Sequence, residues 1–375
     1  RIEMKIAILG FGTVGRGVYE ILQRKETNDT AQLEAAHIFI RKGKEKTLSV
    51  MTDDLDVILE DPECRCVVEV MGGIEPAHTY ILKALRKGKH VVTANKAVVA
   101  AHLEEFLETA RQHQVQFRFE ASCAGGIPWI RSLLQAKRID AIRSISGIFN
   151  GTANYIIDQM VKKDLDFETA LTQAQAAGYA EADPSADIDG IDTANKAMIS
   201  ASLAFDTICT RDFPIGGIRH LQKRDLQTFL QNGCSVRLMM EARKEEDRYA
   251  IAVVPTLIAR DSLEANVPDN FNLTTLVGST LGELKLYGQG AGALPTGNAV
   301  VSDLIAIARN EWDDAFVDHH LHYDASLLKG DYLLRENDRY QVYHDVTPQW
   351  MADRYREAMT GDAGAFWAKI PAKGE

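Results

Sequence analysis

The sequence predicts an α/β protein in which a doubly wound parallel sheet is followed by an α+β domain. Strand-like apolar runs alternate with helical patterns through the first half of the chain, and a glycine-rich turn joins the first run to the first helix. After about Pro128 this order gives way to a mixture of strands and helices. Regular alternation is typical of a parallel sheet covered by helices, whereas the mixture is typical of an α+β domain.

The first half contains five strand-like runs separated by amphipathic stretches. The first run lies directly before the glycine-rich turn, and in the helical stretches apolar residues recur every three to four positions. The expected strands are 5–9, 35–40, 66–70, 90–93 and 116–119, and the expected helices are 14–23, 77–86 and 103–112.

The second half is expected to hold antiparallel strands, several helices and a last helix that returns to the first domain. We expect a first domain at 1–130 with 298–325 packing back on it, a second at 131–297, and a short C-terminal tail at 326–375. The expected strands are 144–149, 248–255 and 284–287, and the expected helices are 154–163, 167–178, 193–205 and 298–309.

Composition and charge narrow the class of protein. The 375 residues are 46% hydrophobic, which can fill two ordinary cores, and the formal net charge is −11 without a Lys/Arg-rich run. Nucleic acid is therefore an unexpected partner. No apolar run approaches the roughly 20 residues of a membrane span, and Arg1 to Glu3 lead straight into a strand. The cysteines number five and form no CxxC pair, which suits a reducing compartment, so we expect a cytoplasmic protein.

The glycine-rich turn is a dinucleotide-binding fingerprint. Gly10, Phe11, Gly12, Thr13, Val14 and Gly15 read GxGxxG, directly after a strand and directly before a helix. The first glycine permits the tight turn, the second lets the backbone approach a pyrophosphate, and the third lets helix and strand pack closely. The pyrophosphate would lie at the helix N-terminus, which favours anions. The sequence therefore predicts a Rossmann-type domain that binds a nicotinamide dinucleotide, although a purely structural turn would also use these glycines.

The end of the second strand bears on the choice of cofactor. An NAD-specific site carries an Asp or Glu there to bind the ribose 2′-hydroxyl. This chain instead has Arg41, Lys42 and Lys44 after Ile40. Cations suit a 2′-phosphate, so we expect NADP to be preferred and NAD to be possible, unless these residues form only a solvated loop.

Two lysines could handle a proton in hydride transfer to a carbonyl group. Lys96 follows the strand 90–93, where the nicotinamide would lie, although a lysine at a strand end is commonly solvent-facing. Lys196 lies four residues after Asp192 on the expected helix, so the two side chains share a face. An exposed pair would be worth only about 0.3–0.5 kcal/mol, but the apolar residues after Lys196 argue against an ordinary surface face.

An acidic loop precedes this helix. Glu181, Asp183, Asp187 and Asp189 crowd the residues before it, and we expect Asp189 to be the N-cap with Asp192 near the third helical position. Glu120 opens another candidate segment, 120–128, in which small residues expose backbone carbonyls. This turn could hold a monovalent cation or a substrate carboxylate, or it could be only a crossover between domains.

Together these segments resemble the homoserine dehydrogenase family from Lys5 to about Arg309. Several long motifs in the family's order carry the resemblance more strongly than any single one. They are 72–77, 91–96, 120–128, 149–156, 178–196 and 287–296.

The resemblance implies reversible NAD(P)H-dependent reduction of L-aspartate 4-semialdehyde to L-homoserine, a step of threonine, methionine and isoleucine biosynthesis. It implies Lys196 and Lys96 as acid–base candidates with Asp192 near the reacting oxygen, and substrate binding by Glu181, Asp187 and Asp192. The implied contacts to the cofactor add Thr93, Asn95, Lys96 and Gly292 to the glycine turn, and the implied sodium ligands are Glu120 and the carbonyls of Cys123, Gly125 and Ile127.

The resemblance also implies a homodimer, or a higher homo-oligomer, formed through the second domain. Cys123 departs from the aliphatic residue usual in the family, but the implied ligand there is a backbone carbonyl. Members often carry a C-terminal ACT regulatory domain, which needs roughly 60 or more residues. Fewer follow Gly330, so we expect an incomplete ACT domain and leave threonine feedback open.

Two other functions share the fingerprint. An aspartate dehydrogenase-like enzyme would reduce an imine and would not need Glu181, Asp192 and Lys196 together. A non-catalytic NADP(H) sensor would have no use for paired lysines near the nicotinamide, where we expect the amino groups of Lys96 and Lys196 to converge.

Overall fold

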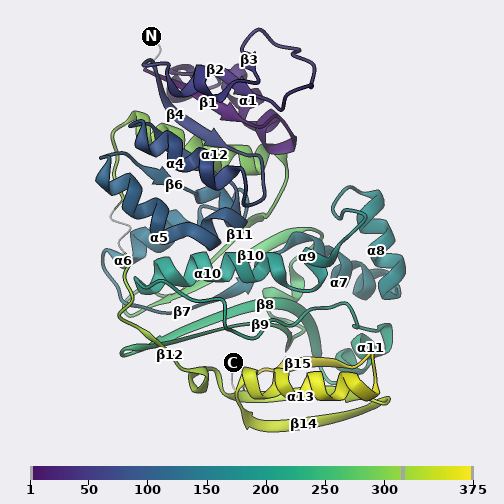
Figure 1. Ribbon diagram of the computed structural model, residues 1–375. Helices are drawn as coiled ribbons and strands as arrows, with labels where there is room; N and C mark the ends of the chain where they lie inside the picture. The colour runs from purple at the N-terminus through teal and green to yellow at the C-terminus, as the bar shows by residue number, and fades with distance from the viewer. Residues whose placement is uncertain (1–2, 314–316, 373–375) are drawn as a thin grey trace. The chain divides into compact units, whose positions relative to one another are not determined.

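The computed structural model describes residues 3–313 and 317–372 (Figure 1). The chain divides into two compact units, and each is described by itself. Unit 1 comprises residues 1–134 with 289–317, and unit 2 comprises residues 135–288 with 318–375. The sequence analysis expected domain limits at 130 and 297 and assigned the residues after 325 to a tail.

Unit 1 is built on a six-stranded parallel sheet. Its strand order is β3-β2-β1-β4-β5-β6, so the order reverses between β1 and β4, and the fold is the doubly wound one that the sequence predicts. Ligands of such sheets bind beyond the carboxyl ends of the strands at this reversal. The strands are β1 (Met4–Leu9), β2 (Leu33–Phe39), β3 (Met51–Thr52), β4 (Cys64–Glu69), β5 (His90–Thr93) and β6 (Phe117–Arg118).

The longer helices of unit 1 cover its sheet because they bury apolar residues against it. In α1, for example, Val18 and Leu22 are fully buried in the same cluster as the β1 residues Ile6 and Ile8. The helices are α1 (Thr13–Arg24), α2 (Asn28–Ala31), α3 (Leu55–Leu59), α4 (Ala77–Arg86), α5 (Lys96–Gln112) and α12 (Ala293–Ala308), with η1 (Glu120–Ser122) before α6 (Trp129–Lys137), which spans the unit boundary.

Helix α12 packs closely on α1, although residues 25–292 lie between them in the chain. A Cβ added to Gly17 would lie 2.1 Å from the carbonyl oxygen of Ala293, and one added to Gly297 would lie 2.9 Å from the Gly17 carbonyl carbon. Val300 and Leu304 then enter the core beneath α1. The close approach of the two helices therefore requires glycine at position 17.

Unit 2 is built on a nine-stranded mixed sheet of order β11-β10-β7-β8-β9-β15-β13-β14, with β12 also paired to β9. Neighbours among β7, β8, β9 and β10 are antiparallel, which is the arrangement expected for the predicted strands 144–149 and 248–255, whereas β15 joins β9 in parallel. The strands are β7 (Ile142–Ile148), β8 (Cys234–Glu245), β9 (Arg248–Ala259), β10 (Phe271–Gly278), β11 (Gly282–Gln289), β12 (His322–Tyr323), β13 (Gly330–Glu336), β14 (Arg339–Val346) and β15 (Phe366–Ile370).

Strands β8 and β10 are absent from the sequence prediction because buried polar residues interrupt their apolar pattern. Arg237 of β8 is buried and donates hydrogen bonds to the carbonyls of Val236 and Ala265. Asn272 and Thr274 of β10 are buried as well. A search for alternating apolar residues passes over such strands.

The helices of unit 2 include one that is almost entirely buried. Helix α10 runs along the sheet and contacts β8 and β9 (Figure 1), and most of its residues from Asp192 to Phe205 are inaccessible to solvent. The helices are α7 (Gly151–Lys163), α8 (Phe167–Ala176), α9 (Ser185–Ile188), α10 (Ile191–Phe205), α11 (Lys223–Gln231) and α13 (Pro348–Gly361), with η2 (Glu264–Asn266) and η3 (Ala325–Leu328).

The segment for which the sequence analysis expects a short tail forms β13, β14, α13 and β15. These elements extend the sheet of unit 2 beyond β9, and Tyr332, Met351 and Trp367 form a core with Ala252 and Val254 of β9. Arg335 of β13 is buried and pairs with Asp225 at 2.7 Å. The described part of the segment contains three strands and one helix, against the four strands and two helices of a complete ACT domain.

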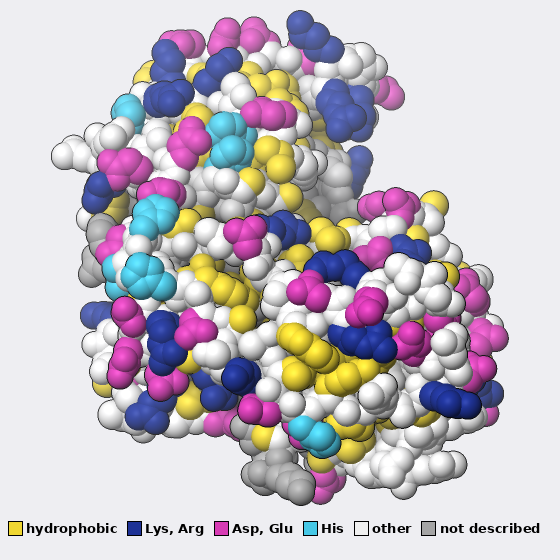
Figure 2. All heavy atoms as spheres, turned by 60° about the horizontal axis from the view of Figure 1, so that its bottom comes forward, with side chains coloured by type: hydrophobic (Ala, Val, Ile, Leu, Met, Phe, Trp, Pro, Cys, Tyr) yellow, Lys and Arg dark blue, Asp and Glu magenta, His cyan; other side chains and the backbone are white. Residues whose placement is uncertain are grey.

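Three further features of the described residues are the charge of the surface, the state of the cysteines and the length of the helices. Acidic and basic side chains are interspersed over the face shown in Figure 2, without a broad basic patch. The cysteines form no disulfide within the described ranges, and all but Cys234 are buried. Across residues 3–313 and 317–372, no helix has the length and apolar character needed to cross a membrane.

Candidate active site

The turn between β1 and α1 has the geometry of a pyrophosphate cradle. Gly10 has φ +105°, a conformation that residues with a side chain rarely adopt. A Cβ on Gly15 would lie 2.4 Å from the Gly10 carbonyl oxygen, so helix and strand can meet only at glycine. Gly12 is the N-cap of α1 and provides no side-chain cap. The first N–H groups of α1 therefore face a site where an anion is favoured.

The other residues of the fingerprint divide between core and surface. Phe11 and Val14 pack partly against the core of unit 1, and Phe11 also lies beneath the Arg16 guanidinium, 4.5 Å from the ring centroid. Thr13 is exposed at the first position of α1. Thr13 therefore presents its side chain at the mouth of the cradle, while Phe11 and Val14 can offer a ligand mainly their backbone.

A hydrogen-bonded row lies at the carboxyl ends of β4 and β5. Glu69 accepts hydrogen bonds from the Thr93 hydroxyl at 2.8 Å and from the Met71 N–H at 2.8 Å. Thr93 Oγ1 accepts from the Asn95 N–H at 3.0 Å, and Asn95 Nδ2 donates to the Gly73 carbonyl at 2.6 Å. Burial raises the pKa of Glu69, and the hydrogen bond from Thr93 opposes that rise. The row fixes Thr93 and Asn95 where a nicotinamide would lie.

Lys96 begins α5 next to this row. Asn95 is the N-cap of the helix, and its side-chain oxygen accepts from the Val98 N–H at 3.2 Å. Lys96 is half-buried at the first helical position. The Asn95 cap therefore fixes the end of the helix from which the Lys96 side chain extends. Such a fixed position suits a group that must contact a substrate.

Glu69 is a site residue that was not expected from the sequence. It is buried, follows the apolar residues Cys66, Val67 and Val68 at the end of β4 and stands next to the sheet reversal. An acidic residue in that place is the signal that could have revealed it, because a buried carboxylate at a strand end needs a polar partner.

The loop after β2 places Arg41 and Lys42 on the surface. Both are exposed, and Gly43 and Lys44 follow them in the same loop. The strand ends at Phe39, and residues 40–44, which follow it in the chain, include no Asp or Glu. The loop is therefore cationic where an NAD-specific site would be acidic.

The turn that contains Gly292 approaches both the α1 side of the sheet and the segment 120–127. Gly292 has φ +116° and precedes α12, whose first residue, Ala293, meets Gly17 of α1. A Cβ on Gly125 would lie 2.4 Å from the Gly290 carbonyl carbon, and the Gly126 N–H donates to the Gln289 carbonyl at 3.0 Å. These turns are therefore fixed against one another.

Glu120 is buried at the N-terminus of α6. Its carboxylate accepts from the N–H groups of Ile130 at 2.8 Å and Arg131 at 3.0 Å, and its own N–H donates to Asp303 at 3.0 Å. Burial raises the pKa of Glu120 to about 8, with repulsion from Asp303 as the next cause. Burial also raises the pKa of Asp303, to about 6. Two buried carboxyl groups thus lie near each other beside the turn 123–127, in which the Ile127 carbonyl accepts from the Trp129 N–H at 2.8 Å.

In unit 2, Lys196, Asp192, Asp187 and Asn150 form one hydrogen-bonded cluster. Lys196 Nζ lies 2.8 Å from Asp192 Oδ2 and donates to the Phe149 carbonyl at 2.6 Å. Asn150 Nδ2 donates to Asp192 at 2.8 Å and to Asp187 at 2.7 Å. Lys196, Asp192 and Asn150 are buried, so the pair is not the exposed ion pair of the alternative interpretation.

Asn150 is a site residue that the sequence analysis did not single out. It is the N-cap of α7, with its side-chain oxygen accepting from the Ala153 N–H at 2.8 Å. An asparagine directly before a helical pattern is a signal for a cap, but its second contact to α10 depends on the fold.

The start of α10 differs from the expectation. Gly190 is the N-cap, with φ +82°, and it makes no side-chain cap. Asp189, which we expected to be the N-cap, instead pairs with Arg219 at 2.7 Å. The prediction was wrong because a nearby guanidinium binds the Asp189 carboxylate more strongly than a backbone N–H would. Asp192 is the second residue of the helix, and its carboxylate binds Lys196 and Asn150.

Glu181 lies outside the cluster of Asn150, Asp187, Asp192 and Lys196 among the residues that the structure describes. It is exposed in the loop between α8 and α9, and its backbone carbonyl accepts from Gln175 Nε2 at 3.0 Å. The candidate residues of the whole site divide between the two units. The cofactor and cation candidates belong to unit 1, whereas Glu181, Asp187, Asp192 and Lys196 belong to unit 2.

The glycine cradle, the sheet reversal and the polar row beyond β4 and β5 define a nicotinamide-dinucleotide-dependent oxidoreductase. Residues 10–120 match the family model described as the NAD-binding domain of homoserine dehydrogenase, and residues 128–305 match the model described as homoserine dehydrogenase. The chain belongs to the homoserine dehydrogenase family.

Curated relatives support this assignment over most of the chain. A homoserine dehydrogenase from Synechocystis is 43% identical over 318 residues, covering 82% of this chain and 73% of the relative. One from Bacillus subtilis is 36% identical over 318 residues with the same two coverages.

Solved structures agree as well. The homoserine dehydrogenase of Thiobacillus denitrificans superimposes with a TM-score of 0.87 at 29% identity and covers 99% of both chains. A hyperthermophilic archaeal homoserine dehydrogenase in complex with NADPH superimposes with a TM-score of 0.69 at 26% identity, covering 83% of this chain and 99% of the other. The function implied by the resemblance is confirmed, in preference to an aspartate dehydrogenase or a non-catalytic sensor.

Proposed function

We propose that this enzyme reduces L-aspartate 4-semialdehyde to L-homoserine with NADPH rather than NADH, and that Lys196 handles the proton. The observation that carries the chemical assignment is the buried contact of Lys196 with Asp192 and the Phe149 carbonyl. The dinucleotide supplies the hydride when bound. The protein must then neutralise the negative charge that develops on the carbonyl oxygen.

Lys196 is suited to that role because its position is fixed. Two acceptors orient the amino group, and Asp192 is oriented in turn by Asn150. An ammonium group has three donors, and one directed at the substrate oxygen would transfer its proton to the developing alkoxide. In the reverse reaction the neutral amine would take the hydroxyl proton of homoserine.

Lys96 is the second acid–base candidate, fixed by the Asn95 cap at the start of α5. Thr93 and Asn95, held by Glu69, would contact the nicotinamide end of the cofactor together with Gly292, and the turn from Gly10 to Gly15 would contact the pyrophosphate.

The acidic groups of unit 2 are suited to the amino group of the substrate. Asp187 lies in the Lys196 cluster through Asn150, and Glu181 stands exposed in the preceding loop. Both would attract an α-ammonium group, and Glu181 would do so without disturbing the pairing of Asp192 with Lys196.

The preference for NADPH rests on the loop after β2. Arg41 and Lys42 are exposed cations at the place where the adenosine ribose would lie, and residues 40–44 include no Asp or Glu. The archaeal relative that was solved with NADPH supports the same cofactor.

The turn 120–127 fits a sodium ion. Its donors would be the Glu120 carboxylate and the carbonyls of Cys123, Gly125 and Ile127, all of them oxygens, which suit a hard cation. Each Glu120 oxygen accepts one backbone N–H and keeps further acceptor capacity. A cation would also favour the ionised form of Glu120, which burial and the neighbouring Asp303 disfavour, and so would stabilise the turn that meets Gly290.

We further propose that the enzyme is a cytoplasmic homodimer or higher homo-oligomer acting in threonine, methionine and isoleucine biosynthesis. Its family membership and the reduced cysteines support this setting. Sedimentation of the purified chain tests the oligomeric state.

The central experiment follows oxidation of the reduced cofactor with two substrates and two cofactors. We expect turnover with aspartate 4-semialdehyde and a higher kcat/KM with NADPH than with NADH. Oxaloacetate with ammonia, the substrates of an aspartate dehydrogenase, should give no turnover. Equal kcat/KM for the two cofactors would contradict the NADPH preference, and turnover of the imine substrate would contradict the assignment of Lys196 to an aldehyde oxygen.

A further inference from the structure

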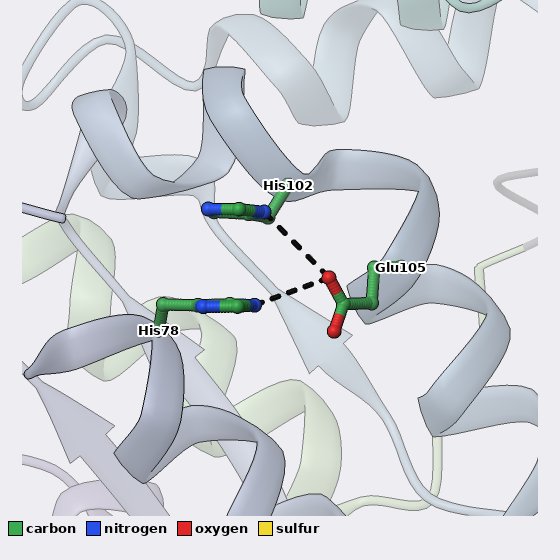
Figure 3. Close-up of side chains that lie close together, drawn as sticks. All are labelled: His78, His102 and Glu105. Atoms are coloured by element: carbon green, nitrogen blue, oxygen red, sulfur yellow. Dashed lines mark hydrogen bonds and ion pairs between the residues drawn. The ribbon is translucent and has the colours of Figure 1, made fainter. Parts of the chain in front are cut away.

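A cluster of two histidines and a glutamate lies between α4 and α5. It includes no residue of the glycine turn 10–15 or of the turn 120–127 that we propose to bind sodium. His78 stands on the first turn of α4, and His102 and Glu105 stand on α5 (Figure 3). One ligand atom from each side chain can be chosen so that all three lie within 4.8 Å of one another. The homoserine dehydrogenase reaction, as proposed above, leaves this cluster without a role.

The geometry points to a binding site for a divalent transition-metal ion such as Zn²⁺, held by His78, His102 and Glu105. Glu105 Oε2 lies 3.1 Å from His78 Nε2 and 3.6 Å from His102 Nδ1. In a tetrahedral zinc site with bonds of about 2.0–2.1 Å, neighbouring ligand atoms are about 3.3 Å apart. The two distances from Glu105 Oε2 are therefore close to those between neighbouring ligand atoms of a coordination sphere.

A second carboxylate lies behind His78, on the opposite ring nitrogen from Glu105. His78 Nδ1 lies 2.9 Å from Glu75 Oε1, and Glu75 is held in turn by the Thr79 hydroxyl at 2.8 Å. A proton on Nδ1 directed at Glu75 leaves the Nε2 lone pair for a metal ion. A carboxylate behind a ligating histidine is the usual outer-shell partner in metal sites.

The surroundings favour an ion that binds imidazole. The buried ring of Phe106 lies under both histidines, 5.7 Å from the His78 ring centroid and 6.0 Å from that of His102. Nitrogen donors suit Zn²⁺, Co²⁺ or Ni²⁺, whereas Mg²⁺ prefers oxygen ligands. Three protein ligands leave a fourth position, which water would occupy.

The backbone shows why these side chains meet. His102 has φ −134° and ψ 23°, values that interrupt α5 with a kink, and Glu105 follows three residues later on the same side of the helix. The two imidazole rings are stacked, with centroids 3.7 Å apart and planes inclined by 7°. An imidazole binds a metal ion in the plane of its ring, so ion binding would turn one ring out of this stack.

The site would join α4 to α5 within unit 1. The first turn of α5 carries Lys96, and its N-cap is Asn95. A bound ion would stabilise this unit by mass action, since the unfolded chain cannot hold three ligands so far apart in sequence at that spacing.

The test is titration of the untagged, chelator-treated full chain with Co²⁺ and Zn²⁺. We expect one equivalent of Co²⁺ per chain to produce a visible absorption band, Zn²⁺ to displace it, and Zn²⁺ but not Mg²⁺ to raise the melting temperature. His78→Ala and Glu105→Gln should each weaken binding at least about 100-fold, and Glu75→Ala about 10- to 100-fold, the scale of outer-shell changes.

Matched controls separate this site from adventitious binding. His113→Ala changes another histidine at the C-terminal end of α5, and His320→Ala with His322→Ala changes the local histidine run in unit 2. Both controls should bind as the wild type does. The far-ultraviolet circular dichroism of each metal-free variant verifies folding. Absence of Co²⁺ binding by the wild type, equal binding by folded His78→Ala and Glu105→Gln, or loss of binding in a control would overturn the proposal.

Discussion

Lys196 and Asp192, one turn apart on α10, form an ion pair at 2.8 Å in which the two side chains retain only 9% and 7% of their exposure. A pair on a helix surface would contribute little to stability, because water competes with it. Here burial removes that competition. Asn150 and the Phe149 carbonyl supply the further hydrogen bonds that a buried pair requires.

Replacing Lys196 with Ala should lower kcat for aspartate 4-semialdehyde by at least about 100-fold, because positioned proton transfer is worth that much. NADPH binding should be nearly unchanged. Steady-state kinetics and NADPH fluorescence titration measure the two effects. Lys163→Ala, at the exposed end of α7, is the control and should retain wild-type kcat. A Lys196→Ala enzyme with unchanged turnover would remove Lys196 from the mechanism.

A double variant examines whether Lys96 acts in the same step. If both lysines serve one proton transfer, Lys96→Ala combined with Lys196→Ala should lose much less activity than the product of the two single losses. Strictly multiplicative losses would assign Lys96 to a separate role, such as cofactor binding.

Replacing Arg41 with Asp should shift preference from NADP toward NAD. The carboxylate would repel a 2′-phosphate and could accept a hydrogen bond from a ribose hydroxyl. The ratio of kcat/KM for NADPH to that for NADH measures the change, and Arg143→Asp at an exposed position of β7 should leave the ratio unaltered. An unchanged NADPH affinity in the Arg41 variant would refute the proposed role of this loop.

Replacing Asn150 with Ala should lower both stability and turnover. The variant loses the N-cap of α7, worth about 1 kcal/mol, and it also loses the donor to Asp187 and Asp192. Asp166→Ala removes the N-cap of α8, where the side chain accepts from the Thr169 N–H at 2.8 Å. Both variants should unfold at lower denaturant concentration, but only Asn150→Ala should lose kcat. Equal kcat in the two would restrict Asn150 to a structural role.

Stability should depend on pH through His90. Burial lowers the pKa of His90 to about 4, because the half-buried ring is poorly solvated when charged, and the positive charges of Arg65 and Arg118 lower the pKa further. The neutral ring accepts the Gln116 N–H at 2.9 Å. The unfolded chain takes up the proton near pH 6.5, so this contribution is complete above about 6.5 and is lost as pH falls toward 4.

Denaturant unfolding between those pH values measures the effect. In His90→Asn, where an amide oxygen can replace the acceptor, the free energy of unfolding should rise less with pH across that window. His322→Asn, at an exposed position, should retain the wild-type slope. A slope unchanged by His90→Asn would show that other groups cause the dependence.

Local pattern was sufficient for much of the fold. The glycine turn, β5 and α4 agree with their expected limits, because their apolar period, their boundaries and their glycines act over a few residues. Strands β8 and β10 could not be found in this way, since both contain polar residues, Arg237 and Asn272, that the fold buries. The burial of Arg237 depends on the Ala265 carbonyl, which is distant in the sequence.

The sequence by itself determined the dinucleotide fingerprint, the lysine and carboxylate candidates and the family to which they belong. Only the tertiary structure decided that Glu69 orients Thr93, that Asn150 reaches α10, and that Asp189 binds Arg219 instead of capping a helix. It also brought His78 to His102 and Glu105. Spacing along the chain determines which side chains share a face of one helix or strand. Contacts between elements depend instead on how their buried surfaces pack, and on which polar groups need a hydrogen-bond partner once they are buried.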